Sequence, residues 1–145
     1  MIHKFTLENS HDAKQLGGWL ATLVDHKPMT IFLRGDLGMG KTTVAQGMIA
    51  SLLKSDVHIP SPTFTYMNRY ERFVPIYHFD LYRIEEPDHM YELGLNSLLE
   101  DDAAIRIIEW PERQCCLLTP DIDVHLTKIK TTRSALVNFL TSTRA

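Results

Sequence analysis

The sequence has few cysteines and no long apolar run. Only two cysteines, Cys115 and Cys116, occur in 145 residues, and they are adjacent. Neighbouring cysteines rarely bridge and two ligands are too few for a structural zinc site, so we expect reduced apolar side chains. No stretch approaches the roughly 18 consecutive apolar residues of a membrane-spanning helix. Residues 1–5 lack the apolar core of a secretory signal, and we expect a cytoplasmic protein with no membrane contact.

The chain also lacks a strong charge of either sign. Its formal net charge is −3, and no run of Lys and Arg interrupts the sequence. Because charge-driven binding to nucleic acid needs a concentrated basic patch, we expect little direct binding to RNA or DNA. Repeats, low-complexity tracts and linker-like segments are absent too, so the sequence predicts a single domain over residues 1–145.

One strong motif is present. Residues 35–42 read Gly-Asp-Leu-Gly-Met-Gly-Lys-Thr and fit the pattern G-x-x-x-x-G-K-[ST] without a mismatch. The apolar run before it, 29–33, is typical of a buried parallel strand, and residues 43–54 after it have helical spacing. A strand, a glycine-rich turn and a helix in this order predict a P-loop, which binds the phosphates of a nucleotide.

The residue types of this motif match the chemistry of phosphate binding. Backbone N–H groups of the loop and the start of the helix attract phosphate oxygens. Lys41 supplies a positive charge to the terminal phosphates, and the hydroxyl of Thr42 is placed for Mg²⁺. Gly35 and Gly40 permit backbone angles and a close approach that a Cβ atom would block. We therefore predict a site for a nucleoside triphosphate with Mg²⁺.

Two absences narrow the nucleotide and the reaction. GTPases of this class carry an N-K-x-D motif that reads guanine, and neither that motif nor a D-x-x-G segment between the P-loop and Asp80 occurs here, which favours ATP. The chain also has no room for the substrate domain and Arg-rich lid of a nucleotide kinase. This argues against a small-molecule kinase, which remains the alternative to an ATPase. A non-catalytic nucleotide-binding module is a third possibility.

The periodicity of apolar residues predicts an α/β fold. The expected strands are 2–7, 29–34, 64–71, 74–80, 104–109 and 121–130, and the expected helices are 10–26, with Ser10 as N-cap, 43–54, and 87–93 with Gly94 as C-cap. Residues 134–140 fit either a strand or a helix. This order predicts a P-loop NTPase-like three-layer fold with a mixed central sheet.

Two predicted strands end in a carboxylate. Asp80 closes the apolar run 74–80, and Glu109 closes the run 104–109. Ligand sites in α/β folds lie at the carboxyl ends of strands, and Mg²⁺ beside a triphosphate needs an acidic partner there. We expect at least one of the two to act with the P-loop.

Two further residues are candidates on weaker grounds. Strand alternation puts His78 on the same face as Asp80, where it could orient that carboxylate; an ordinary hydrogen-bonded core histidine is the favoured alternative. The neighbouring aromatics Tyr77, Phe79 and Tyr82 are interpreted as core. Thr63 lies in an irregular segment after the P-loop helix, where P-loop ATPases and GTPases place a hydroxyl that senses the γ-phosphate or Mg²⁺.

Taken together, the motifs resemble those of the TsaE family, bacterial ATPases required for N6-threonylcarbamoyladenosine in tRNA. The matching segments occur in the family's order: 35–43, Ser61-Pro62-Thr63-Phe64, His78-Phe79-Asp80-Leu81-Tyr82-Arg83, Glu92-Leu93-Gly94 and Ile108-Glu109-Trp110-Pro111. The resemblance covers essentially the whole chain. Met39 departs from it, because the family usually has Ala there; the position contributes backbone to the loop, so we expect little effect.

The resemblance implies an activity, cofactors, partners and residue roles. It implies Mg²⁺-dependent ATP hydrolysis that supports tRNA modification by the TsaD and TsaB proteins. Carried over, Asp80 positions or activates the attacking water and Thr63 acts as a switch, while Trp110 packs near the site or serves the partner surface. By the same resemblance, the expected phosphate ligands are Gly38, Met39, Gly40, Lys41, Thr42 and Thr43; the expected Mg²⁺ ligands are Thr42 and Glu109; the expected adenine contacts are Ser10 and Arg133.

Overall fold

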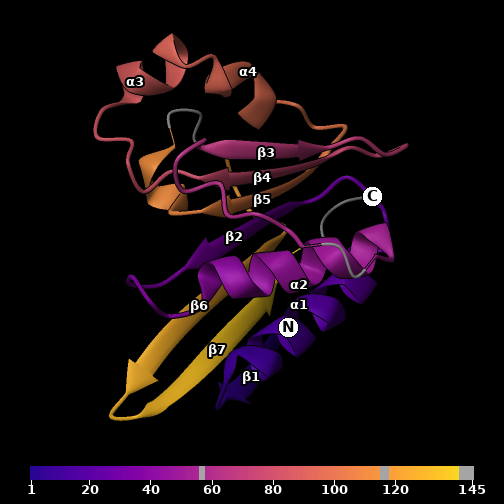
Figure 1. The fold of residues 1–145 in the computed structure, drawn as a ribbon, viewed down its shortest axis with the longest axis vertical. Coiled ribbons are helices and arrows are strands. Elements are labelled where there is room, and N and C mark those ends of the chain that lie inside the picture. The colour runs from indigo at the N-terminus through magenta and orange to yellow at the C-terminus, as the bar shows by residue number, and fades with distance from the viewer. Residues whose placement is uncertain (56–57, 115–117, 141–145) are drawn as a thin grey trace.

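The chain forms a seven-stranded mixed sheet flanked by helices (Figure 1). The computed structural model describes residues 1–55, 58–114 and 118–140, so Cys115 and Cys116 lie outside the described residues. The strands are β1 (Ile2–Leu7), β2 (Thr30–Arg34), β3 (Met67–Tyr70), β4 (Ile76–Asp80), β5 (Ile105–Glu109), β6 (Ile122–Ile129) and β7 (Thr132–Phe139). The helices are α1 (Ser10–Val24), α2 (Lys41–Leu53), α3 (Pro87–Glu92), α4 (Leu95–Leu99) and the 3₁₀ turn η1 (Pro111–Arg113). Together they confirm the predicted α/β class.

The strand that leads into the P-loop lies at the centre of the sheet. The strand order is β1-β7-β6-β2-β5-β4-β3, and β2 pairs in parallel with both β5 and β6. A strand covered on both faces must be apolar throughout, which explains the unbroken run Ile31, Phe32 and Leu33. The outer pairs β3–β4, β6–β7 and β1–β7 are antiparallel, so the sheet is mixed, as predicted.

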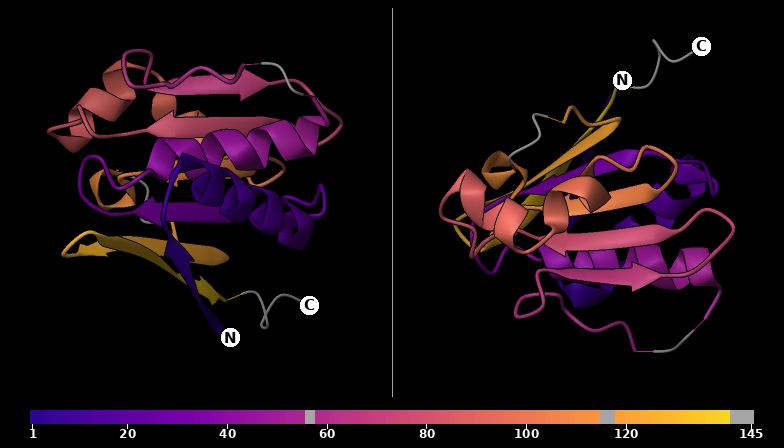
Figure 2. Two further views of the ribbon diagram at one scale, coloured as in Figure 1. Left: turned by 60° about the horizontal axis from the view of Figure 1, so that its bottom comes forward. Right: turned by 90° about the horizontal axis from the view of Figure 1, so that it is seen from above.

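Helices cover the sheet from both sides and divide the core in two. Figures 1 and 2 show α1 and α2 packed together on one face, and α3 and α4 over the other face at the β4–β5 end. Alternate side chains of strand β4 pack into different cores. Ile76 lies in the α1–α2 core, whereas Tyr77 and Phe79 lie in the α3–α4 core. This confirms the predicted faces of β4 and leaves His78 and Asp80 on the α2 side.

The structure corrects several predicted boundaries. The N-cap of α1 is Asn9 rather than Ser10, because the Asn9 side chain accepts a 2.9 Å hydrogen bond from the Asp12 N–H. Strand β3 begins only at Met67, since residues 63–65 form a turn. The ambiguous segment 134–140 is strand up to Phe139, where β7 ends, and β7 pairs with β6 along its whole length. Helix α4 was missed because five residues are too few to show a period.

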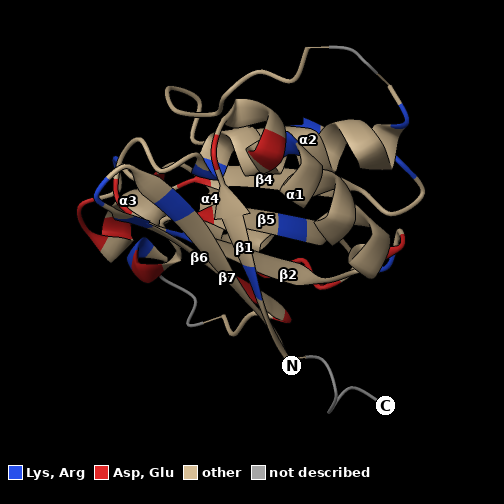
Figure 3. Cartoon of the chain, turned by 90° about the horizontal axis from the view of Figure 1, so that it is seen from below, with Lys and Arg blue, Asp and Glu red and all other residues tan. Residues whose placement is uncertain are grey.

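The charged residues are distributed rather than gathered. In Figure 3, Lys and Arg segments and Asp and Glu segments are interspersed over the sheet and helices. Within the described ranges, none of the helices has the length and apolar character that a membrane span requires.

Candidate nucleotide-binding site

The P-loop turns the chain from β2 into α2 and leaves its backbone open. Gly38 and Gly40 have φ values of 78° and 102°, in the left-handed region that glycine tolerates best. A Cβ atom at either position would meet no other atom within 4 Å, so the loop borders open space there. Helix α2 begins directly after it, with the Val44 N–H donating to the Gly40 carbonyl at 3.0 Å. The first N–H groups of α2 therefore point at the same space, as an anion site requires.

A cavity of about 340 Å³ in front of this loop brings most of the predicted site residues together. It is lined by Leu37, Gly38, Gly40, Lys41, Thr42, Thr43, Thr63, Asp80, Tyr82, Glu109, Trp110 and Arg133. The P-loop, the start of α2, the Thr63 turn, the ends of β4 and β5 with the residues just after them, and the start of β7 all contribute. Met39 lines the neighbouring cavity instead. Ser10 is exposed in the first turn of α1 and lines neither of these two cavities.

Lys41 is buried at the base of the cavity, with 5% of its surface exposed. Its ammonium donates to the carbonyl of Gly35 and, at 2.9 Å, to that of Asp36, and it lies 4.4 Å from the centre of the Trp110 ring. Burial lowers the pKa of Lys41, while the charges of Glu109 and nearby carboxylates oppose that shift. Within the described part of the chain it has no ion-pair partner, so its charge can serve an anionic ligand.

Thr42 and Glu109 are joined by a hydrogen bond. The Thr42 hydroxyl donates to Glu109 Oε1 at 2.7 Å, and Glu109 Oε2 lies 2.7 Å from His78 Nε2. His78 therefore contacts Glu109 and not Asp80, and its buried, hydrogen-bonded side chain fits the favoured alternative of a core histidine. The two strands β4 and β5 are in a register that places Ile107 beside His78, and Glu109 reaches back to the imidazole. Sequence alternation gave the face of His78 but not this register.

Asp80 and Glu109 lie side by side at the ends of adjacent parallel strands. Asp80 is 6% exposed; it accepts from the Tyr82 N–H at 3.1 Å and from the Thr63 hydroxyl at 3.3 Å. Burial raises the pKa of Asp80, the negative charge of Glu109 raises it further, and the two donors only partly offset this. Ser61 continues the chain of hydroxyls, with its Oγ 2.7 Å from Thr63 Oγ1. The predicted switch residue thus touches a predicted catalytic residue.

The oxygen atoms of this cavity suit a hard cation that brings further ligands with it. Magnesium binds oxygen and is held by one or two carboxylates together with substrate phosphates. Thr42 and Glu109 supply one hydroxyl and one carboxylate, next to the loop that would hold those phosphates. Over residues 1–55, 58–114 and 118–140, His, Cys, Asp and Glu form no cluster of three or more that could hold a metal alone. The donor set therefore fits a metal that arrives with a nucleotide.

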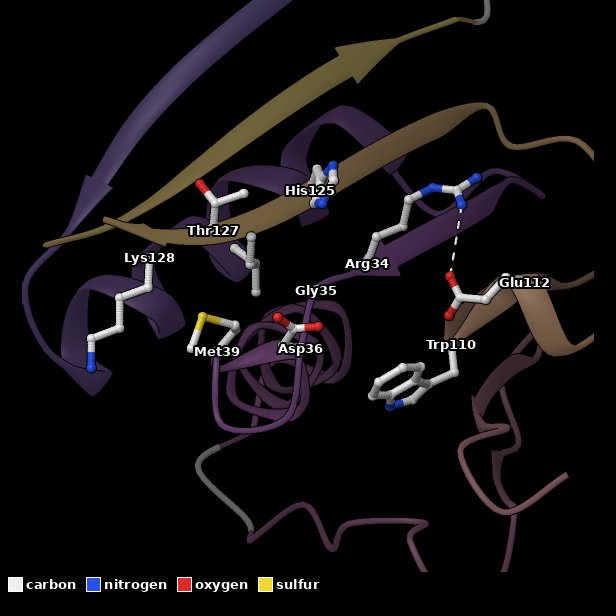
Figure 4. A pocket seen from close by; sticks show the side chains of 10 residues that line it. Arg34, Gly35, Asp36, Met39, Trp110, Glu112, His125, Thr127 and Lys128 are labelled. Atoms are coloured by element: carbon white, nitrogen blue, oxygen red, sulfur yellow. Dashed lines mark ion pairs between the residues drawn. The ribbon is translucent and has the colours of Figure 1, made fainter. Parts of the chain in front are cut away.

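A second cavity, of about 470 Å³, lies on the other side of Trp110 (Figure 4). Figure 4 shows Met39 and Trp110 on either side of Asp36. Arg34 spans the rim: its Nε bonds Asp123 Oδ1 at 2.8 Å, and its guanidinium lies 3.9 Å from Glu112. Trp110 lines both cavities, so its side chain lies beside the candidate site.

One aromatic residue of the site was misinterpreted. Tyr82 is not a plain core residue: it lines the P-loop cavity, and its ring lies 4.9 Å from that of Trp110. Its place two residues after the end of a strand that carries His78 and Asp80 is the signal that could have indicated a site role. Leu37 was missed as a lining residue as well, since its exposure of 61% follows from the loop conformation and not from its type.

Comparison with known proteins identifies the family. A family model described as "Threonylcarbamoyl adenosine biosynthesis protein TsaE" matches residues 7–135. A relative from Rickettsia bellii, described as "tRNA threonylcarbamoyladenosine biosynthesis protein TsaE", is 38% identical over 131 residues, which cover 87% of this chain and 88% of the relative. A relative from Haemophilus influenzae with the same description is 35% identical over 112 residues, 77% of this chain and 69% of the relative. The chain therefore belongs to the TsaE family.

A solved structure supports the fold. The crystal structure described as YdiB from Bacillus subtilis superposes with a TM-score of 0.68, covering 97% of this chain and 86% of that chain at 24% sequence identity. The similarity shows that the mixed-sheet, P-loop NTPase-like architecture is shared.

Proposed function

We propose that this member of the TsaE family is a Mg²⁺-dependent ATPase that acts with TsaD and TsaB in forming threonylcarbamoyladenosine in tRNA. Membership of the family supports the pathway. The site supports the chemistry. The observation that carries the proposal is the hydrogen bond between the Thr42 hydroxyl and Glu109, which joins the P-loop helix to a strand-end carboxylate beside Asp80.

The loop and helix residues would bind and orient the triphosphate. The amides around Gly38 and Gly40 face the phosphates, and the Lys41 ammonium exchanges its loop carbonyls for phosphate oxygens. The Thr42 hydroxyl donates a hydrogen bond to Glu109, so the lone pairs of its oxygen stay available to a cation. When bound, Mg²⁺ neutralises charge that develops on the phosphates during transfer.

Asp80 would hold the attacking water. Ionised Asp80 is an acceptor with two oxygens, and one of them already takes the Thr63 hydroxyl. A water hydrogen-bonded to the carboxylate is oriented by an element, β4, that is buried on both faces. Because phosphoryl transfer depends mainly on positioning and on charge stabilisation, this rigid support matters more than strong basicity.

The nucleotide base and the partners follow from the family and from the sequence. The missing guanine-reading motif favours ATP. Arg133 lines the P-loop cavity and is available to the nucleotide, whereas Ser10 would have to reach it from the exposed start of α1. The net charge of −3 suits a subunit that leaves tRNA binding to TsaD and TsaB.

Replacing Glu109 by Ala tests the proposal. We expect Mg²⁺-dependent ATP hydrolysis to fall by about 10²-fold or more, the loss typical of removing one group that stabilises transition-state charge. Cells that carry only Glu109→Ala should lack threonylcarbamoyladenosine in tRNA, as seen by mass analysis of tRNA nucleosides. Glu100→Ala, an exposed residue at the end of α4, is the matched control and should behave as wild type.

Two results would overturn the proposal. Survival of both hydrolysis and tRNA modification in Glu109→Ala would remove the catalytic assignment. Transfer of labelled phosphate from ATP to a metabolite rather than to water would indicate a kinase.

A further inference from the structure

We propose that His78 is a positioning residue that holds the Glu109 carboxylate in the orientation required to bind Mg²⁺. The inference rests on the proposed Mg²⁺–ATP function. It assigns a role to a residue behind the cavity wall, since His78 does not line the cavity itself.

The contact between the His78 and Glu109 side chains is short and is shielded from solvent. Imidazole Nε2 and carboxylate Oε2 are 2.7 Å apart, and the side chains are 0% and 2% exposed. Water therefore does not compete for the bond, and a hydrogen bond to a carboxylate is among the stronger ones in proteins.

The hydrogen-bonding pattern assigns the ring nitrogen that carries the proton. An ionised carboxylate only accepts, so Nε2 must be the donor. The other nitrogen, Nδ1, is buried and meets no hydrogen-bond partner among the described residues. A buried N–H without an acceptor is costly, so the geometry favours a hydrogen on Nε2 that points at Glu109.

This arrangement is expensive if His78 serves packing alone. Its neighbour on the same face, Ile76, fills the α1–α2 core with an apolar side chain. An imidazole with an unsatisfied Nδ1 costs desolvation that an aliphatic residue avoids. The hydrogen bond to Glu109 offsets that cost. We therefore infer that His78 is there to hold this carboxylate.

The effect of the bond is to fix the plane of the carboxylate. One oxygen of Glu109 takes the His78 N–H and the other takes the Thr42 hydroxyl, each at 2.7 Å. With each oxygen held by a different partner, one of them on the P-loop helix, the side chain is fixed in one orientation. Groups that orient metal ligands in this way typically contribute 10- to 100-fold to metal affinity.

Amide variants of His78 separate positioning from packing. Gln places its amide nitrogen near the position of Nε2 and can still donate to Glu109, whereas the shorter Asn amide cannot reach it. We expect His78→Asn to raise the Mg²⁺ concentration that half-saturates binding of a fluorescent ATP analogue by about tenfold. His78→Gln should stay within about threefold of wild type. Nucleotide binding in EDTA should be unchanged in both variants.

The Mg²⁺ dependence of ATP hydrolysis is a second assay of the same variants. His78→Asn should need about tenfold more Mg²⁺ for half-maximal rate yet approach the wild-type kcat when Mg²⁺ saturates. Circular dichroism and the thermal midpoint without ligand establish that each variant is folded. If His78→Asn does not fold, the comparison of His78→Gln with His78→Phe decides in the same assay.

Each failure points to a different conclusion. An unchanged Mg²⁺ requirement in folded His78→Asn, or equal losses in the Asn and Gln variants, overturns the positioning role. If wild-type protein shows neither Mg²⁺-dependent nucleotide binding nor hydrolysis, the proposed function fails and the inference fails with it. If the wild-type protein hydrolyses ATP and His78→Asn has the same Mg²⁺ requirement, the positioning role fails and the proposed function stands.

Discussion

Asp80 and Glu109 place two carboxylates in unfavourable proximity at the candidate site. Their strands are adjacent and in register, so two carboxylates lie next to each other at a buried edge. Lys41 is close enough for its charge to interact with both, but it donates its hydrogen bonds to the P-loop carbonyls. The pKa of Asp80 is therefore raised, chiefly by burial. Groups with perturbed pKa values in a cavity are typical of catalytic sites.

Because its pKa is raised, ionised Asp80 lowers the free energy of unfolding of the ligand-free protein. A carboxyl whose pKa is higher in the folded state than in the unfolded state costs stability once it ionises. We predict that Asp80→Asn raises the thermal midpoint at neutral pH. The gain should shrink as the pH falls through the Asp80 pKa and vanish below the ordinary aspartate value of about 3.9. Thermal midpoints measured without nucleotide from pH 8 downward would show this.

Asp101 provides a control of opposite sign. The Tyr77 hydroxyl donates to Asp101 at 2.7 Å and holds the pKa of that carboxyl below its usual range, helped by the Ala103 N–H. Asp101→Asn should therefore lower the thermal midpoint at neutral pH, and the loss should disappear in acid. Parallel behaviour of the Asp80 and Asp101 variants would contradict the electrostatic account of Asp80.

At the scale of elements, the P-loop helix is held in place by a close contact with α1. A Cβ atom added to Gly47 in α2 would lie 2.5 Å from the Lys14 carbonyl of α1, which is backbone and cannot move aside. The two helices therefore approach closely only because glycine stands at the crossing. Since α2 carries Lys41 and Thr42 in its first turn, this packing also fixes the candidate site.

Gly47→Ala should destabilise the protein. Overpacking at a contact that cannot relax costs about 1–3 kcal/mol, more than the helix propensity that alanine gains. Gly18→Ala in α1 is the matched control, because its Cβ would meet only the Ser51 hydroxyl at 3.2 Å, and that side chain can rotate. The control should be neutral or stabilising by up to about 1 kcal/mol. Urea unfolding of the two variants measures the difference, and equal midpoints would refute the crossing argument.

At this scale the sequence predicted most elements for simple reasons. The apolar run before the P-loop could only be a buried strand, and the spacing of Val44, Met48 and Leu52 matches the buried face of α2. The ends were harder. Asn9 and Ser10 are both good caps, and only the bond to the Asp12 N–H decides between them. Segment 134–140 became a strand because β6 was available to pair with it.

For the whole molecule, the site opens toward solvent and has contributions from distant parts of the chain. The P-loop cavity takes residues from position 37 to position 133. Such a site can be completed by a partner, and P-loop enzymes often need a group supplied in trans for fast hydrolysis. In GTPases that help is worth about 10³-fold or more.

We therefore predict slow hydrolysis by the isolated chain and faster hydrolysis with TsaD and TsaB. A phosphate-release assay should show stimulation of at least about tenfold, a small part of what assistance in trans can give. Glu109→Ala with the same partners is the control and should stay inactive. Rapid turnover by the isolated chain, unaffected by the partners, would count strongly against a role as an accessory subunit.

The amino-acid sequence by itself determined the glycine-rich P-loop motif, the α/β class and the strand-end carboxylates, because each of these follows from local residue type and spacing. The tertiary structure alone decided which side chains meet. The register of β4 against β5 places Glu109 within hydrogen-bond distance of His78. The packing of the elements brings Arg133 and Trp110 to the cavity in front of the P-loop and leaves Ser10 outside it. Contacts between distant segments depend on register and helix packing, and no local pattern encodes them.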